Sequence, residues 1–376
     1  MTSYVVVNNS QELFGPMDSG AIATCIWEIC RAAQVEDCRP LVLTQRQESK
    51  VYDWPDVRFL ERRGDRSGRL GRIDHRLTGW QRSSQRAYAH AALAEIRSIR
   101  PEVVLCNNDP QIAAFLAGQL RDVTVVHWFH NLELVPDGWR RVFRRSGVRS
   151  VAVSRYLAKA IEMVYDLGHG AVQVAMNGVD AERFAPQPRT ADDQLAIGFL
   201  GRVAVEKGVD DLLEAALLLA SHRDDFRVEI AGDTNWGRSD PGSYRDKIDK
   251  LSGELMVRGI DVRRHGHVPR ERVPLVAGGF DIQVVPSRWD EPFALTLLEG
   301  MALGLPIVAT AAGGMPEVLG SAGVLVPRED PQVLAEALDR LLDDEPERKR
   351  LADAAQRRAM ELSWSRTWHG LRAVED

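Results

Sequence analysis

Residues 284–302 read VVPSRWDEPFALTLLEGMA, and this stretch decides the fold class. A β-branched run ends at Pro286, a polar loop follows, and Pro292 is expected in the first turn of the apolar helix that completes the stretch. The same order, a short strand and then a longer amphipathic segment, recurs along most of the chain. Such alternation is typical of parallel sheets whose strands are joined by crossover helices.

Strands are predicted in two successive series. The first covers residues 4–7, 40–43, 103–106, 123–127, 150–153 and 172–175, and the second covers 195–200, 226–231, 260–264, 281–285, 306–309 and 323–326. Helices are predicted over residues 20–33, 111–119, 154–165 and most of 331–376. Two series of similar length predict two doubly wound α/β domains, with ligands bound beyond the carboxyl ends of the strands and the cleft between the domains as the expected site. Residues 184–193 contain Pro186 and Pro188 with little periodicity, so they are interpreted as the linker.

Composition excludes several classes of protein. The 376 residues are 44% apolar, which is enough for two ordinary cores, and the net charge of −6 excludes a general polyanion binder. Four cysteines form no C-x-x-C pair and have no His at zinc spacing, so we expect reduced, mostly buried thiols and neither a disulfide nor a metal site. No basic leader, long apolar stretch, G-x-G-x-x-G or P-loop is present, which favours a cytoplasmic location and disfavours nicotinamide enzymes and P-loop kinases.

Charge is distributed unevenly along the chain. Residues 1–185 carry 24 basic and 21 acidic side chains, a net charge of +3, which leaves −9 for the rest. The region from Arg58 to Arg100 holds 11 Arg against four acidic residues, and residues 139–149 hold five Arg and no acid. The first region also has apolar side chains at near-helical spacing, namely Leu70, Ile73, Leu77 and Trp80. Two interpretations stay open: a solvated Arg-rich surface, or a patch for an anionic acceptor or a membrane surface.

Two carboxylates and two cations could carry chemistry. Glu291 and Glu299 are eight positions apart, at most roughly 12 Å along a helix, a span comparable to that between the hexose and the ribose of a nucleotide sugar. Arg202 and Lys207 follow the first strand of the second series, where two fixed cations could neutralise a departing diphosphate without a metal. The alternatives are that Glu291 caps a helix, that Glu299 bonds backbone, and that the cations are ordinary surface charges.

Glycine-containing turns follow two of the predicted strands. Gly313-Gly314 comes after residues 306–309, and Ser19-Gly20 opens the first predicted helix. Each turn allows the backbone to approach a ligand closely, and each could equally be a tight connection between a strand and a helix.

These segments together resemble the donor domain of glycosyltransferase family 4. The matching motifs are Gly-Arg, then Glu-Lys-Gly, then Pro-Ser-x-x-x-Glu-Pro-Phe-Ala-Leu-x-x-Leu-Glu-Gly-Met-Ala, then Gly-Gly-x-Pro-Glu. Further matches are Ala152-Val153-Ser154, Asn177-Gly178-Val179-Asp180 and His265-Gly266-His267-Val268, so the resemblance covers roughly residues 120–325. It implies a GT-B fold, in which two Rossmann-like domains face each other across a cleft. Residues 1–184 with 361–376 would form the acceptor-binding domain, and residues 185–360 the donor-binding domain.

The resemblance also implies roles for individual residues. Arg202 and Lys207 would grip the diphosphate, Glu291 would bond hydroxyls of the donor sugar, and Glu299 would bond the ribose. Other donor-binding positions would be Gly20, Gly201, His267 and the amides of Phe293, Ala294 and Leu295. His130 matches a histidine near the donor sugar and joins Arg202, Lys207 and Glu291 as a catalytic candidate, whereas His127 is the weaker candidate of the two.

Two positions depart from the family pattern. The family's N-terminal Gly-Gly loop is Ser19-Gly20 here, so an amide contact to the diphosphate is expected only at Gly20. The usual Phe-Gly is Phe293-Ala294, which adds a methyl group where the backbone meets the donor. The choice of sugar is expected to differ accordingly.

The expected function is that of a retaining, metal-independent glycosyltransferase without a cofactor. It would move a hexose from a nucleoside-diphosphate sugar to a hydroxyl of a cell-envelope saccharide, a lipid-linked acceptor or a natural product such as an aminocyclitol. The Arg58 to Arg100 region would allow peripheral membrane contact, and no nucleic acid partner is expected. The alternatives are an epimerase or a sugar phosphorylase of the same fold, or a non-catalytic anion-binding protein.

Overall fold

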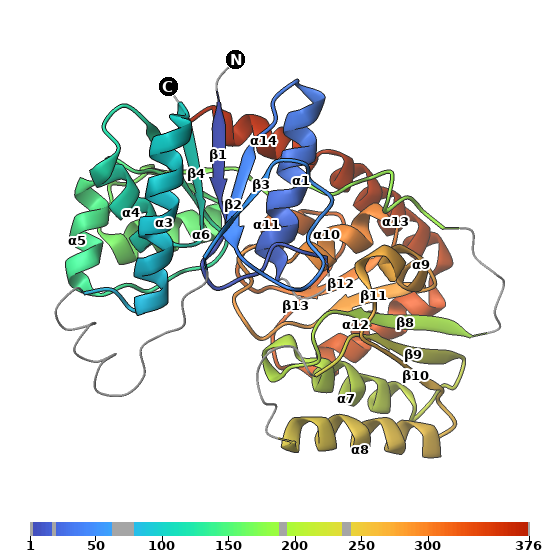
Figure 1. Ribbon diagram of the computed structural model, residues 1–376. Helices are drawn as coiled ribbons and strands as arrows, with labels where there is room; N and C mark the ends of the chain where they lie inside the picture. The colour runs from blue at the N-terminus through green and yellow to red at the C-terminus, as the bar shows by residue number, and fades with distance from the viewer. Residues whose placement is uncertain (1–2, 17–19, 62–78, 188–193, 235–241, 375–376) are drawn as a thin grey trace. The chain divides into compact units, whose positions relative to one another are not determined.

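The computed structural model describes residues 3–16, 20–61, 79–187, 194–234 and 242–374 (Figure 1). It divides into two compact units. The first contains residues 1–177 and 364–376, and the second contains residues 178–363. Each unit is built on one parallel β-sheet, as the alternation of strands and helices predicts.

The sheet of the first unit has the strand order β3-β2-β1-β4-β5-β6-β7, and every pair of neighbours is parallel. From β1 the chain first adds β2 and β3 on one side and then β4 to β7 on the other side. The order of strands therefore reverses between β1 and β4, which creates a topological switch point there. Helices α3 to α6 pack against one another in succession, whereas α1 packs with α14. The elements are β1 (Tyr4–Val7), α1 (Ala21–Val35), β2 (Leu41–Gln45), β3 (Val57–Leu60), α3 (Ser83–Ile99), β4 (Val103–Asn107), α4 (Pro110–Gln119), β5 (Thr124–Phe129), α5 (Asp137–Arg145), β6 (Arg149–Ala152), α6 (Arg155–Tyr165), β7 (Val172–Val174) and α14 (Trp364–Arg372).

The sheet of the second unit has the order β10-β9-β8-β11-β12-β13, with its switch point between β8 and β11. One face packs on α7, α8 and α12 in a continuous apolar core, and α10 and α13 contact β12. The elements are β8 (Leu195–Leu200), η1 (Val205–Lys207), α7 (Val209–Leu219), β9 (Phe226–Ala231), α8 (Ser243–Val257), β10 (Val262–Gly266), η2 (Arg270–Arg272), α9 (Val273–Ala277), β11 (Ile282–Val285), α10 (Leu295–Ala302), β12 (Ile307–Thr310), α11 (Met315–Leu319), β13 (Val324–Val326), α12 (Pro331–Asp343) and α13 (Glu345–Met360).

The boundary between the units lies before the expected linker. Residues 178–184 belong to the second unit because the amide of Val179 donates to the carbonyl of Leu362 over 2.9 Å, and Val179 also forms a parallel bridge with Ser363. Phe184 is fully buried, with the Arg270 guanidinium 5.7 Å from the centre of its ring. The same contacts place residues 361–363 in the second unit. Residues 188–193 of the expected linker lie outside the described residues.

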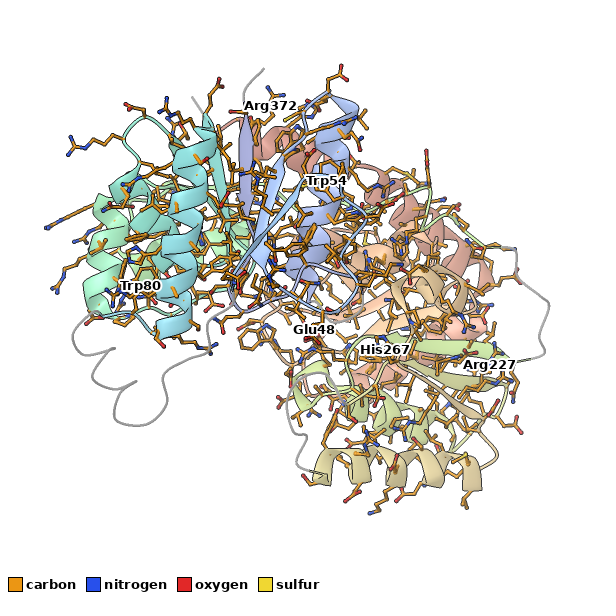
Figure 2. All side chains as sticks on the ribbon, in the orientation of Figure 1. Glu48, Trp54, Trp80, Arg227, His267 and Arg372 are labelled. Carbon is orange, nitrogen blue, oxygen red and sulfur yellow. The ribbon has the colours of Figure 1, made fainter. Side chains whose placement is uncertain are left out.

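Helix α14 belongs to the first unit. Trp368 is almost fully buried, and its ring meets that of Tyr4 on β1 at 4.9 Å between centroids. The hydroxyl of Thr367 donates to the carbonyl of Met176 over 2.6 Å, and Arg372 pairs with Glu36 just after α1 over 3.1 Å (Figure 2). Burial of the aromatic side chain therefore fixes the end of the chain on the first strand.

Three local expectations need correction. Pro292 is not in the first turn of α10, because that helix begins at Leu295 after Ala294, whose left-handed backbone (φ 65°, ψ 80°) is not helical. Strand β3 was not predicted, because its side chains are mostly exposed and form no apolar run. Helices α3 and α5 were also not predicted, because they lie within Arg-rich sequence. Leu70, Ile73 and Leu77 lie outside the described residues, but Trp80 is buried against Trp139 at 4.8 Å between ring centroids (Figure 2).

No helix in the described ranges is long and apolar enough to cross a lipid bilayer. The four cysteines, all within the described ranges, are not joined in disulfides, and Cys25, Cys30 and Cys106 are buried.

Candidate active site

The switch point of the second sheet brings two of the predicted segments together. Gly201 and Arg202 follow β8, and Ser287 to Glu291 follow β11, the strand that pairs with β8. Parallel strands end at the same edge of a sheet, so these loops are neighbours although more than 80 residues of chain separate them. His267 follows β10 at the same edge and is exposed (Figure 2).

Lys207 and Glu291 form an ion pair at this edge. Nζ of Lys207 donates to Oε1 of Glu291 over 2.5 Å, and the two side chains are 23% and 9% exposed. The hydroxyl of Ser287, which is almost fully buried, donates to the same oxygen over 2.7 Å. Within the described part of the chain, Oε2 of Glu291 accepts no hydrogen bond. The protein therefore fixes one carboxylate oxygen of Glu291 through two hydrogen bonds, and the other oxygen has no partner among the described residues.

The turn that carries Lys207 needs glycine at its next position. Gly208 has a φ of +66°, and a Cβ there would lie 2.1 Å from the carbonyl oxygen of Pro286. A larger residue would push the turn away from the loop after β11. Gly208 therefore allows Lys207 to approach Glu291. Arg202, on the more exposed side of the turn, pairs with Glu206 over 3.2 Å.

The Gly313-Gly314 turn packs against the backbone of Glu291. The amide of Gly314 donates to the Glu291 carbonyl over 2.6 Å, and a Cβ on Gly313, whose φ is +58°, would lie 2.3 Å from that carbonyl oxygen. The turn is therefore a tight connection that packs on the backbone of Glu291, and close approach of its backbone to a ligand stays a prediction.

Ala294 occupies the position at which the family pattern has glycine, and its backbone has the left-handed conformation that glycine adopts most easily. Its left-handed conformation costs an L-residue roughly 1–2 kcal/mol. Phe293 before it is buried, whereas Ala294 and Leu295 are partly exposed at the start of α10. Amides at the start of a helix favour an anion, which suits a sugar-phosphate at this position.

Glu299 is buried on α10 and paired. Oε1 accepts a hydrogen bond from Nη1 of Arg270 over 2.7 Å, and Arg270 also stands over the ring of Phe184. Arg270 could not be singled out from the sequence, because only the folded chain brings η2, three residues after His267, within hydrogen-bond distance of Glu299 on α10.

The first unit carries a buried polar cluster at its own switch point. His130 follows β5, its amide donates to Oδ1 of Asn108 over 2.9 Å, and its Nε2 lies 3.3 Å from Oδ1 of Asn107. Burial lowers the pKa of His130 to about 3, so the imidazole is neutral at pH 7 and can donate or accept a hydrogen bond. Neither asparagine was recognised from the sequence.

His127 has the structural role. It is fully buried, its Nε2 accepts the amide of Asp109 over 2.9 Å, and its ring contacts those of Phe129 and Phe143. Burial lowers its pKa well below the usual value, with the nearby His130 as a further cause. A neutral ring that holds the start of α4 in place is therefore the role the structure shows.

Carboxyl groups surround this cluster. Burial raises the pKa of Asp109 to about 6, although hydrogen bonds from Ser10 and Gln85, each 2.6 Å long, partly offset it. Burial raises the pKa of Glu12 to about 7, against the opposing effect of the amides of Ala23 and Gly20 at the start of α1. Burial also raises the pKa of Glu133. Gly20 was expected to contact a diphosphate, but the acidic group that lies next to it in the structure is the carboxyl of Glu12. Ser19, the other residue of this turn, lies outside the described residues.

Two family descriptions match the chain and together cover both units. Residues 22–183 match Glycosyltransferase Family 4, and residues 180–358 match Glycosyl transferases group 1. The chain belongs to the glycosyltransferases of family 4 and has the GT-B fold.

Relatives known by sequence include proteins named D-inositol 3-phosphate glycosyltransferase. The one from Corynebacterium aurimucosum is 32% identical over 281 residues, which are 67% of this chain and 65% of the relative. That from Salinispora arenicola is 32% identical over 292 residues, 69% of this chain and 65% of the relative. The chain thus spans less than two thirds of the length of these relatives.

Solved structures share the fold at low sequence identity. A glycosyltransferase from Rickettsia africae superimposes with a TM-score of 0.79 at 18% identity, covering 99% of this chain and 98% of the other. Anabaena HepE, in a structure described as a complex with UDP and glucose, gives a TM-score of 0.72 at 18% identity and covers 99% of both chains.

Proposed function

We propose that this chain is a retaining, metal-independent glycosyltransferase that moves a hexose from a nucleoside-diphosphate sugar to an acceptor hydroxyl. The observation that carries the proposal is the ion pair between Lys207 and Glu291 at the switch point of the second sheet, with Arg202 beside it. A cation for the leaving group and a carboxylate for the sugar are held side by side.

The leaving group would be stabilised by fixed positive charge. Lys207, Arg202 and the amides at the start of α10 would bind the diphosphate more tightly as negative charge develops on its oxygens, which lowers the barrier rather than only the dissociation constant. Because two side-chain cations supply this charge, the chemistry we propose needs no metal ion. Turnover unchanged by EDTA would support this, and turnover lost with EDTA but restored by Mg²⁺ or Mn²⁺ would contradict it.

Sugar and ribose would be recognised by different carboxylates. Oε2 of Glu291 would accept a hydroxyl of the hexose, while Oε1 stays with Lys207 and Ser287. Glu299 would accept the ribose hydroxyls beside its bond to Arg270. We assign His130, which is neutral, a hydrogen bond to the transferred sugar.

Retention of configuration follows from the family resemblance. In the proposed reaction, the bond between the anomeric carbon and the diphosphate oxygen breaks, an oxocarbenium-like sugar forms, and the acceptor oxygen attacks from the face that the diphosphate leaves. The acceptor proton passes to the departing diphosphate. Retention through a carboxylate nucleophile would instead need a second carboxyl about 5 Å away.

For the acceptor, we propose a polyol or sugar hydroxyl, because the relatives are named for inositol 3-phosphate. The description of HepE in complex with UDP-glucose supports a nucleotide-sugar donor. The test is a panel of UDP-, GDP- and dTDP-sugars scored by thermal stabilisation. A true donor at about 100 times its Kd should add about 2.7 kcal/mol to the free energy of unfolding. The identity of the products then distinguishes transfer from isomerisation or phosphorolysis, and the NMR coupling constant of the anomeric proton shows whether transfer retains the configuration. No stabilisation by any nucleotide would overturn the proposal.

A further inference from the structure

Arg288 forms a forked ion pair with the start of α7. Its Nε donates to Oδ2 of Asp211 over 2.9 Å, and its Nη2 donates to Oδ1 of Asp211 over 2.5 Å and to Oδ2 of Asp210 over 2.9 Å. Asp210 and Asp211 are 2% and 5% exposed. We call these three residues the Arg288 clamp.

The clamp joins the two segments that carry the candidate site. Asp210 and Asp211 come three and four residues after Lys207, and Arg288 comes three residues before Glu291. The backbone amides of Arg288 and Trp289 both donate to the carbonyl of Glu206, over 3.0 and 3.2 Å. In sequence, the amide bonds to Glu206 precede Lys207 and the clamp residues Asp210 and Asp211 follow it, so both sets of bonds connect the segment around Lys207 to the loop after β11.

We propose that Arg288 is a positioning residue for the transfer reaction, because its fork to Asp210 and Asp211 sets the position of Lys207 relative to Glu291. This inference rests on the proposed function. A single ion pair between the flexible Lys207 side chain and Glu291 cannot fix that position, because a lysine ammonium is a point charge on four rotatable bonds. A planar guanidinium that donates several hydrogen bonds does fix the two segments relative to each other, because the bonds determine both the orientation of the guanidinium and its distance from the carboxylates.

The surroundings of the clamp act differently on its two carboxylates, because burial raises the pKa of Asp211 against the opposing effect of its hydrogen bonds from Arg288. Burial acts to raise the pKa of Asp210, but hydrogen bonds from Lys247, Tyr244 and Arg288 outweigh it and lower that pKa. Lys247 and Tyr244 both come from α8, so Asp210 is held from a second direction over 2.6 and 2.8 Å. The acidic side of the clamp is thus anchored in the body of the unit, and Arg288 attaches the loop after β11 to it.

The test compares Arg288→Lys with a matched control at Arg328, which follows β13 and contacts the same loop. Arg328 donates to the carbonyl of Arg288 and pairs with Asp290 at a more exposed position, so Arg328→Lys makes the same change of side chain outside the clamp. Titration with UDP counts the folded sites, and the rate of UDP release from UDP-glucose gives kcat per site. If the donor panel selects another base, GDP and a GDP-sugar, or dTDP and a dTDP-sugar, are used in place of UDP and UDP-glucose.

We expect Arg288→Lys to lower kcat per site by about tenfold or more while changing the Kd for UDP less than threefold, because geometry is lost but charge is kept. Arg328→Lys should stay within twofold of the wild type in both. Asp211→Asn keeps the size of the side chain and should reproduce the loss of kcat, which provides the test if Arg288→Lys does not fold.

A kcat per site within twofold of the wild type in the folded clamp variants would overturn the positioning role. Equal losses of kcat and of UDP affinity would also overturn it, since they indicate a general loss of the site. A wild-type protein that neither binds nor turns over any member of the donor panel would instead overturn the proposed function itself, and the positioning role with it.

Discussion

Glu291 accepts hydrogen bonds from Lys207 and Ser287 on the same oxygen, Oε1, over 2.5 and 2.7 Å. This shared oxygen couples the expected leaving-group cation to the expected sugar carboxylate. Loss of Lys207 leaves a buried carboxylate without its cation, so the effects of the two residues on turnover should not be additive.

Lys207→Ala and Arg202→Ala should each lower kcat by ~100-fold or more, because each removes a charge-assisted bond that strengthens as the diphosphate leaves. Steady-state kinetics on the donor selected by the panel measures this. Lys250→Ala removes an exposed lysine of α8 and serves as the control. Wild-type kcat in both site variants would show that these cations do not bind the leaving group.

Glu299→Gln and Glu291→Gln should differ in what they change. Glu299→Gln should weaken the binding of free UDP by about tenfold and leave kcat nearly unchanged, because the ribose does not change charge in the reaction. Glu291→Gln should lower kcat and affect UDP binding little. Calorimetric titration with UDP and steady-state kinetics separate the two, and equal losses of UDP affinity in both variants would contradict the division.

Ala294→Gly should raise the free energy of unfolding by about 1 kcal/mol, because glycine adopts the left-handed backbone without the Cβ penalty. Removal of the methyl should also change the relative kcat/KM for two sugar nucleotides that differ at one hydroxyl. Ala302→Gly in the helical backbone of α10 is the control and should destabilise by about 1 kcal/mol. Equal destabilisation by both substitutions would rule out strain at Ala294.

Glu12→Gln should change the pH dependence of stability. The pKa of Glu12 in the folded chain, about 7, exceeds the ordinary value of 4.5, so the folded state binds more protons than the unfolded state between these values. Stability of the wild type therefore falls as pH rises from about 4.5 to 7, and Glu12→Gln should remove up to about 3 kcal/mol of that fall. Chemical denaturation at pH 5 and pH 8 measures it.

Glu48→Gln changes an exposed carboxyl of the same unit and serves as the control for the loss of one charge (Figure 2). The same pH dependence in Glu12→Gln and the wild type would show that Glu12 ionises as readily in the folded chain as in the unfolded one.

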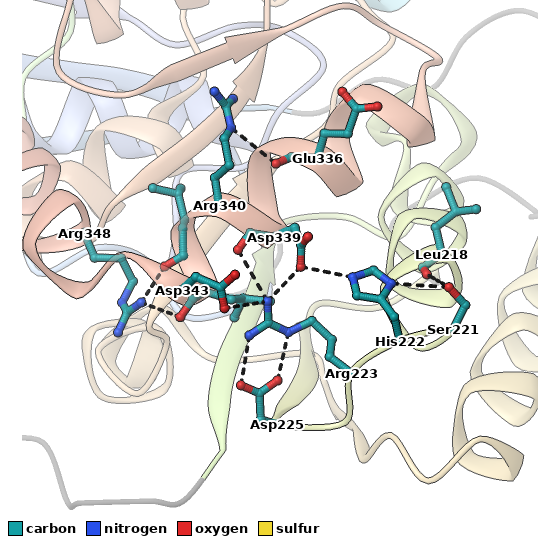
Figure 3. A network of polar contacts seen from close by, with 12 residues as sticks. Leu218, Ser221, His222, Arg223, Asp225, Glu336, Asp339, Arg340, Asp343 and Arg348 are labelled. Carbon is teal, nitrogen blue, oxygen red and sulfur yellow. Dashed lines mark hydrogen bonds and ion pairs between the residues drawn. The ribbon is translucent and has the colours of Figure 1, made fainter.

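Arg223 links the loop before β9 to α12 through three carboxylates, Asp225, Asp339 and Asp343 (Figure 3). Hydrogen bonds from Arg223 lower the pKa of Asp225 and of Asp339. A lowered pKa stabilises the fold above the unfolded value and loses that effect as pH falls through the folded value. Arg223→Gln should therefore destabilise by up to about 1 kcal/mol at pH 7, and by less at pH 3.

Urea denaturation at both pH values and at low and high salt measures the contribution of Arg223. Arg340→Gln on α12, where the side chain donates to the Glu336 carbonyl, is the matched control. An Arg223→Gln effect that is the same at pH 3 and pH 7 would show that packing, rather than charge, accounts for it.

The sequence by itself determined the class of fold and most of its strands. β1, β8 and β9 begin and end at the predicted residues. β1 (YVVV) and β8 (LAIGFL) have almost no polar residues, as expected of buried parallel strands, whereas β9 (FRVEIA) alternates apolar and charged side chains. β3 was missed because an edge strand with exposed side chains has no apolar run. Family motifs in the sequence also named Lys207, Glu291 and Glu299.

Only the tertiary structure decided what those residues contact. Glu291 pairs with Lys207, 84 residues away, and Glu299 pairs with Arg270, 29 residues away. Arg288 pairs with Asp211, 77 residues away. Such pairs depend on which strands become neighbours at a switch point and on how the loops pack there, and local periodicity contains neither. The left-handed backbone of Ala294 was hidden for a related reason, because the loop after β11 and the start of α10 impose it on a residue that would not adopt it alone.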